Sequence, residues 1–136
     1  MKVAVVFWSG TGNTEEMAKL VAQGVESNGN TAELVSCDKF NKSLVGNFDA
    51  FAFGCPSMGA EELEDGEFLP MWEDVKSELN GKNVVLFGSY GWGDGEWMET
   101  WKSECGSMNL LGDFICCGAA SGDDETSCVE LGKLLK

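Results

Sequence analysis

Runs of consecutive apolar residues, separated by stretches with helical spacing, restrict the fold of this chain more than any other feature of its sequence. The clearest runs are MKVAVVFW at residues 1–8, DAFAFGC at 49–55 and KNVVLFGS at 82–89. A strand that is apolar on both faces is typical of a parallel sheet, because helices cover both of its faces. Weaker β-prone runs at residues 31–37 and 113–118 bring the predicted strands to five.

The stretches between and after these strands have the apolar spacing of amphipathic helices. We predict helices over residues 13–27, 67–79, 94–105 and 125–136, and we interpret the whole pattern as strand and helix alternating five times. This predicts an α/β fold: a doubly wound five-stranded parallel sheet of strand order 2-1-3-4-5, with helices on both faces. The helical spacing of Trp97 and Trp101 indicates core residues rather than ligand contacts.

Size and charge set the next limits. The chain has 136 residues, so we expect residues 1–136 to form a single domain. It has 23 acidic residues, nine lysines, and neither arginine nor histidine, for a net charge of −14. This charge excludes a basic nucleic-acid surface and a polybasic membrane patch. The lack of histidine excludes catalytic mechanisms that use a histidine base.

The cysteines have neither C-x-x-C nor zinc-site spacing, so we expect no metal site. A chain of this size and apolar content needs no disulfides, and we expect reduced thiols that pack as small apolar side chains. The six positions are Cys37, Cys55, Cys105, Cys116, Cys117 and Cys128. The sequence also has no recognisable targeting or membrane-spanning segment, from which we expect a cytoplasmic protein. We also expect the protein to be a monomer.

Three loops are expected to lie together, because the carboxyl ends of parallel strands meet at one edge of the sheet. The first, SGTGNT at residues 9–14, joins a buried strand to a helix. Backbone N–H groups at a helix start form an anion site, and the hydroxyl and amide groups of the loop add donors. No lysine follows, so this is not a Walker A loop, and we expect a phosphate held by N–H and O–H donors alone. The alternative is an ordinary glycine-rich turn with an asparagine cap.

The second loop is CPSMGAE at residues 55–61, and the third is GSYGWGDG at residues 88–95. Two aromatic side chains among four glycines do not have the spacing of core residues. They are therefore expected to be exposed or to cover a flat ligand, with Met58 of the second loop against the opposite face of that ligand.

Taken in order, these loops resemble those of the short-chain flavodoxins of anaerobic bacteria. The matching strings are WSGTGNTE at residues 8–15, GCPSMG at 54–59 followed by EELE, and FGSYGWGDG at 87–95 followed by Trp97 and Met98. The resemblance covers essentially the whole chain. In the long-chain class an insertion interrupts the fifth strand, and the fifth predicted strand of this chain has no such insertion. It implies FMN as the cofactor and low-potential one-electron transfer between redox enzymes as the function.

The resemblance also implies roles for single residues. The first loop binds the phosphate, Ser57 and Ser89 lie near the ribityl chain, and Met58 and Trp92 pack on opposite faces of the isoalloxazine ring. No contacts are assigned to residues 118–124. The complete set of expected FMN-binding residues is Ser9, Gly10, Thr11, Gly12, Asn13, Thr14, Pro56, Ser57, Met58, Gly59, Ala60, Glu61, Ser89, Tyr90, Gly91, Trp92 and Gly93.

Within this set, Gly59, Ala60 and Glu61 border the N5 and N3 edge of the ring, and Gly91 and Gly93 border its pyrimidine edge. Glu61 is expected to accept the N3–H and to lower the second reduction potential, because its charge opposes the extra electron. The Gly59 carbonyl is expected to turn toward N5 in the reduced forms. A glycine followed by an alanine suits the type II′ turn that this needs.

Two functions remain open at this point. The first is an electron carrier without a substrate of its own, and the alternative is an FMN-dependent NAD(P)H:quinone reductase. The net charge of −14 opposes the binding of anionic NADPH and favours redox partners with basic docking surfaces. A phosphoacceptor receiver domain is excluded, because Cys55 and Ser9 stand where that class needs carboxylates.

Overall fold

The computed structural model describes residues 1–8, 10, 12–57, 63–91 and 95–135. Five strands form one parallel sheet in the order β2-β1-β3-β4-β5, which confirms the expected fold. The strands are β1 (Lys2–Phe7), β2 (Thr31–Ser36), β3 (Ala50–Gly54), β4 (Asn83–Tyr90) and β5 (Asn109–Cys117). The α-helices are α1 (Asn13–Ser27), α2 (Phe68–Val75), α3 (Glu96–Ser103) and α4 (Asp123–Lys133).

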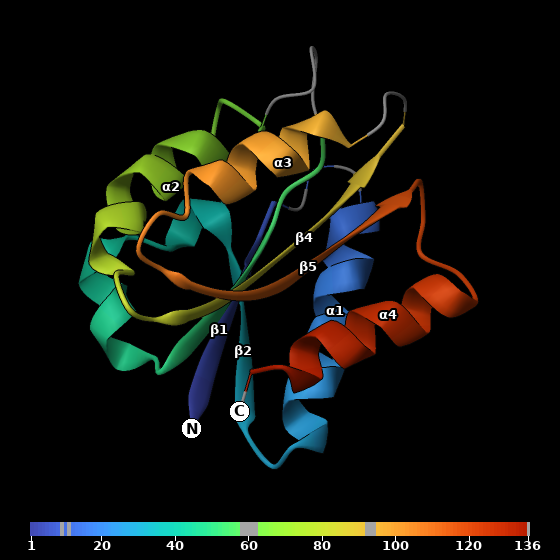
Figure 1. The fold of residues 1–136 in the computed structure, drawn as a ribbon, viewed down its shortest axis with the longest axis horizontal. Coiled ribbons are helices and arrows are strands. Elements are labelled where there is room, and N and C mark those ends of the chain that lie inside the picture. The colour runs from blue at the N-terminus through green and yellow to red at the C-terminus, as the bar shows by residue number, and fades with distance from the viewer. Residues whose placement is uncertain (9, 11, 58–62, 92–94, 136) are drawn as a thin grey trace.

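The helices cover the two faces of the sheet in pairs, α1 with α4 and α2 with α3 (Figure 1). Side chains of β1 alternate between the two cores: Val3 and Val5 pack toward α1 and α4, whereas Ala4 and Val6 pack toward α2 and α3. This alternation follows from the two-residue period of a strand. It also explains why the central strands are apolar throughout.

The expected fivefold alternation of strand and helix is wrong at one connection. Between β2 and β3 the chain forms two 3-10 helices, η1 (Cys37–Lys39) and η2 (Lys42–Asn47), in place of an α-helix. Asn41 caps η2 by accepting the N–H of Ser43 at 3.0 Å, a side-chain bond that favours turns over longer helices. Buried side chains of this connection still complete the core under α2, namely Cys37, Phe40, Val45 and Phe48.

Several element bounds also differ from the sequence prediction. The helix predicted at 94–105 is α3, which spans Glu96–Ser103. β5 begins at Asn109 rather than at residue 113, because pairing with β4 holds residues 109–112 in the sheet, with a register shift between Val84 and Val85. The 67–79 helix is α only to Val75 and continues as the 3-10 helix η3 (Lys76–Glu78). α4 begins two residues earlier than predicted and ends at Lys133.

The core has the expected composition. Trp97 and Trp101 are each 1% exposed, which confirms their packing role. All six cysteines are free thiols, and Cys117 alone among them is exposed. No helix among the described residues is long and apolar enough to cross a membrane, and the same residues contain no cluster of three or more potential metal ligands.

Candidate functional site

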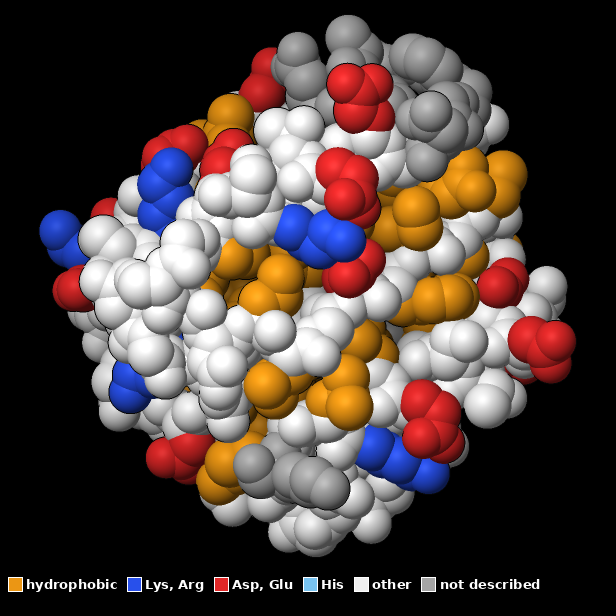
Figure 2. All heavy atoms as spheres, viewed as in Figure 1, with side chains coloured by type: hydrophobic (Ala, Val, Ile, Leu, Met, Phe, Trp, Pro, Cys, Tyr) orange, Lys and Arg blue, Asp and Glu red, His pale blue; other side chains and the backbone are white. Residues whose placement is uncertain are grey.

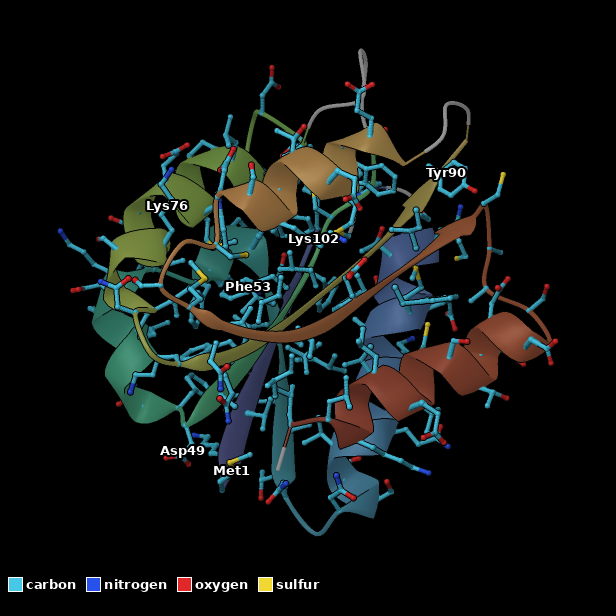
Figure 3. All side chains as sticks on the ribbon, in the orientation of Figure 1. Met1, Asp49, Phe53, Lys76, Tyr90 and Lys102 are labelled. Carbon is cyan, nitrogen blue, oxygen red and sulfur yellow. The ribbon has the colours of Figure 1, made fainter. Side chains whose placement is uncertain are left out.

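A pocket of about 160 Å³ lies at the carboxyl ends of the strands. It brings together the start of α1, the segment after β3, the end of β4 and the segment after β5. Tyr90, at the end of β4, lies on this side of the sheet (Figure 3). The residues that line the pocket are Asn13, Pro56, Ser57, Ser89, Tyr90, Gly91 and Gly118.

A larger hollow of about 380 Å³ lies along the edge strand β2. Its lining includes Lys2, which is paired with Glu33 at 3.5 Å and lies over the Phe48 ring. None of its described lining residues belongs to the loops at 9–14, 55–61 or 88–95. We therefore assign the site to the smaller pocket, where the polar loop residues converge.

The start of α1 has no side-chain cap among the described residues. Gly12 is the N-cap residue, with φ of 88°. The first turn of a helix leaves N–H groups without partners inside the helix. The asparagine cap expected in the alternative is wrong, because Asn13 is the first residue of the helix rather than its cap. A glycine suits this cap because its φ is positive.

Thr14 adds a hydroxyl donor at the same helix start. The residue is 0% exposed, and its Oγ1 has no hydrogen-bond partner among the described residues. A buried hydroxyl without a partner is unfavourable. A helix start to which the described residues give neither a cap nor a partner for this hydroxyl suits a phosphate, which accepts hydrogen bonds and is attracted by the helix dipole.

Backbone hydrogen bonds hold the loops together beyond the ends of the strands. The N–H of Ser57 donates to the Ser89 carbonyl at 2.9 Å, and the N–H of Gly118 donates to the Tyr90 carbonyl at 2.9 Å. A Cβ at Gly88 would lie 2.2 Å from the carbonyl oxygen of Cys55, so only glycine permits this close approach. These contacts attach the loop residues of the pocket wall to the ends of the strands.

The Trp8 side chain packs against the first loop at Gly10. Its ring lies where a Cβ at Gly10 would be, 2.0 Å from that position. Its Nε1–H donates to a Glu67 carboxylate oxygen at 3.2 Å. The first loop is thereby linked to the turn before α2. At the other side of the pocket, the Tyr90 ring packs at 5.8 Å from the buried Trp97 ring.

Nine expected FMN-binding residues are described, and six of them line the pocket: Asn13, Pro56, Ser57, Ser89, Tyr90 and Gly91. Gly10, Gly12 and Thr14 lie at the loop and helix start beside it. Eight expected positions lie outside the described residues, so their roles stay predictions: Ser9, Thr11, Met58, Gly59, Ala60, Glu61, Trp92 and Gly93.

Sequence reasoning missed Gly118 as a pocket residue. It follows β5 directly and has a positive φ of 71°. A glycine at the end of the last predicted strand was the available signal, but the segment lacks the sequence strings that identified the other loops.

Glu64 has a structural role that the sequence left open. Its carboxylate accepts backbone N–H groups of Gly66, Glu67 and Phe68, each at 2.8 Å. Partial burial alone would raise the pKa of Glu64, but the hydrogen bonds from Phe68, Glu67 and Gly66 outweigh that effect and lower the pKa. The side chain therefore caps the start of α2 in its ionised form.

We expect this cap to make the stability of the protein depend on pH. Because the pKa of Glu64 is lower in the folded state, its contribution is complete above the unfolded value of about 4.3. It is lost as the pH falls through the lower folded value. In urea unfolding, Glu64→Gln should therefore be less stable than the parent at neutral pH, and this difference should shrink in acid. A difference independent of pH would contradict the prediction, and Asp65→Asn is the control at an exposed neighbour.

Acidic side chains recur over the face shown in Figure 2, and several lysines on the surface pair with them. Lys102 lies 2.9 Å from Glu99 and 3.4 Å from Asp113, and Lys133 lies 3.2 Å from Glu130. Near the site, Asp65, Glu67 and Glu96 are exposed. Most of the surface potential is therefore negative, as the net charge of −14 implies.

The sequence and the fold of this chain are both similar to those of known flavodoxins. The sequence pattern of the Flavodoxin family matches residues 5–130. The chain is 43% identical over 133 residues to the flavodoxin of Megasphaera elsdenii, with 96% of each chain covered. It is 39% identical over 134 residues to the flavodoxin of Clostridium beijerinckii, with 95% of each covered. The solution structure of two-electron reduced M. elsdenii flavodoxin has a TM-score of 0.90 with this chain at 41% identity, covering 98% of this chain and 97% of that one.

Proposed function

The chain belongs to the flavodoxin family, and on that premise we propose that it carries single electrons at low potential between redox proteins. Its cofactor is FMN. The observation that supports this most is the start of α1 beside the strand-end pocket, where the described residues provide neither a side-chain cap for the helix nor a partner for the buried Thr14 hydroxyl. This donor set suits a phosphate monoester without a cationic side chain.

The described residues have distinct roles in this proposal. The N–H groups at the start of α1 and the Thr14 hydroxyl hold the phosphate, and Ser57 and Ser89 border the ribityl chain. FMN supplies the one-electron chemistry when it is bound. The hydrogen bond between the Ser57 N–H and the Ser89 carbonyl keeps both sides of the pocket in place. The roles expected for Met58, Gly59, Glu61 and Trp92 remain part of the proposal.

We propose a carrier rather than an enzyme that oxidises NADPH. The negative surface opposes a strongly anionic dinucleotide. The test is to mix the FMN-loaded protein with excess NADPH in the absence of other proteins and to follow flavin absorbance. A carrier should stay oxidised over minutes, whereas rapid stoichiometric bleaching would favour the NAD(P)H:quinone reductase alternative. Dithionite, which reduces either class, is the positive control.

Electron transfer to a basic partner should slow as salt rises. Acidic residues around the site attract a basic surface at long range, and salt screens that attraction. With cytochrome c as a basic electron acceptor, stopped-flow rates should fall roughly tenfold or more from low to high ionic strength. An uncharged quinone is the matched acceptor, and its rate should change little. Equal salt dependence for both acceptors would contradict a charged docking surface.

We also propose a monomer in a reducing compartment, with the cytoplasm as the expected location. The six thiols are free, as is usual in a reducing environment. The exposed large apolar side chains among the described residues are Met1, Leu34 and Leu134. They lie at the first residue, on β2 and directly after α4, so they offer little apolar area for a stable interface. Light scattering of the purified protein tests the oligomeric state.

A further inference from the structure

Tyrosine and tryptophan side chains follow one another through the core between the sheet and the helices α2 and α3. Tyr90 lines the strand-end pocket, and its ring centroid lies 5.8 Å from that of Trp97. Trp101 lies one helical turn further along the buried side of α3, a spacing at which side chains are neighbours. The ring centroids of Trp101 and Trp72, a residue of α2, lie 5.7 Å apart. We call these residues the aromatic path, and it leads from the pocket to α2.

The far end of the aromatic path is hydrogen-bonded to a carboxylate at the surface. Trp72 is 0% exposed, but its Nε1–H donates to a Glu104 carboxylate oxygen at 3.0 Å. The Glu104 side chain is 34% exposed, and the same oxygen lies 3.9 Å from Lys76 Nζ. The Nε1–H groups of Trp97 and Trp101 are buried without a hydrogen-bond partner among the described residues. A positive charge is therefore more favourable on the Trp72 ring than on the other two indole rings.

We propose that the aromatic path conducts electrons between the surface at Glu104 and bound FMN, and that light absorbed by FMN drives them toward the cofactor. The proposal rests on the proposed function, which places FMN in the pocket that Tyr90 lines. Among aromatic side chains, tryptophan and tyrosine lose an electron most readily. Several short steps between neighbouring rings also move a charge farther than one long step does.

Each step of this reaction moves one electron. FMN that has absorbed light is a strong oxidant and takes an electron from the near end of the path. Electrons from Trp97, Trp101 and Trp72 refill the path in turn. Trp72 then lacks one electron, and its Nε1–H proton moves to Glu104. A small thiol in solution gives one electron to Trp72 and releases its own proton to water, while the proton on Glu104 returns to Nε1. The net result is one electron moved from the thiol to FMN.

The test is laser-flash absorption spectroscopy of the FMN-loaded protein, first alone and then with dithiothreitol as the thiol. The parent should form a long-lived tryptophan radical together with one-electron-reduced FMN, and dithiothreitol should remove the tryptophan signal and leave the FMN signal. Trp72→Phe and Trp101→Phe should lose most of the long-lived signal, because a charge that stays close to FMN returns to it quickly.

A surface variant keeps the test available if the core variants fold poorly. Glu104→Gln retains an acceptor oxygen for the Trp72 Nε1–H but removes the negative charge and the proton acceptor. The tryptophan signal should therefore decay faster in Glu104→Gln than in the parent. A parental lifetime in this variant would contradict the end point that we assign to the path.

Phe68→Leu is the matched control for loss of core packing. Phe68 is 0% exposed, and its ring centroid lies 5.4 Å from that of Trp101. Phenylalanine is too difficult to oxidise to take part in the path, so the long-lived signal of Phe68→Leu should equal that of the parent. An equal loss of signal in Phe68→Leu and Trp101→Phe would overturn the proposal, because disturbed packing would then explain both.

Pulsed electron paramagnetic resonance supplies a second readout, the distance between the two radicals. In the parent, this distance should place the tryptophan radical at Trp72, and in Trp72→Phe it should be shorter. A parent protein that binds FMN but forms no long-lived radical pair, or forms one only at the shorter distance, would refute this proposal alone. A parent protein that binds no FMN would refute the proposed function, and this inference with it.

Discussion

Replacing Thr14 by valine is expected to weaken FMN binding by about 10- to 100-fold and to leave the FMN-free protein at least as stable as the parent. Valine has nearly the same shape as threonine but lacks the hydroxyl. A hydrogen bond to a charged group contributes about 1.5–3 kcal/mol, and each 1.4 kcal/mol is about a factor of ten in affinity. The loss of affinity follows if the Thr14 hydroxyl donates to the FMN phosphate.

The stability of the FMN-free protein should change in the opposite direction. In that state the Thr14 hydroxyl is buried without a partner among the described residues, and a methyl group in its place removes an unfavourable buried polar group. Fluorescence titration with FMN and urea unfolding of the FMN-free protein measure the two effects. Thr126→Val, at an exposed position of α4, is the control. A Thr14→Val protein with parental FMN affinity would refute the phosphate site at the start of α1.

A single added methyl group at Gly24 is expected to destabilise the whole fold. α1 and α4 cross so closely that a Cβ at Gly24 would lie 2.0 Å from the Val129 carbonyl oxygen, and a Cβ at Gly132 would lie 2.1 Å from the Val21 carbonyl oxygen. Both obstacles are backbone atoms, which cannot rotate away, so the helices must separate. Overpacking of this kind costs about 1–3 kcal/mol, and occasionally more.

Urea or thermal unfolding of Gly24→Ala and Gly132→Ala tests this expectation. The double variant should lose less stability than the sum of the two single variants, because one separation of the helices relieves both clashes. Gly46→Ala is the matched control: its Cβ would meet nothing within 4 Å, and alanine in an unstrained position stabilises by about 0.4–1 kcal/mol. Parental stability in Gly24→Ala would show that the helices separate at little cost.

The Gly24–Gly132 crossing illustrates a contact that no local pattern could predict. Residue 24 lies in a stretch with clear helical spacing, where the sequence indicates only that glycine has a low helix propensity. Its packing role depends on α4, which begins far along the chain. The same holds for the hydrogen bond from the Glu64 N–H to the Cys55 Sγ, because two loop residues meet only after the sheet has brought the end of β3 beside the start of α2.

The sequence alone determined the parallel sheet, its strand order and the glycine-rich start of the first helix, where we propose that the phosphate binds. Buried parallel strands are apolar on both faces, and a glycine–hydroxyl loop between such a strand and a helix is a local signal. The tertiary structure decided the 3-10 connection after β2, the early start of β5 through its pairing with β4, and the inclusion of Gly118 in the pocket. It also decided that Glu64 caps α2, because the direction of a carboxylate depends on which backbone N–H groups the fold leaves unpaired beside it.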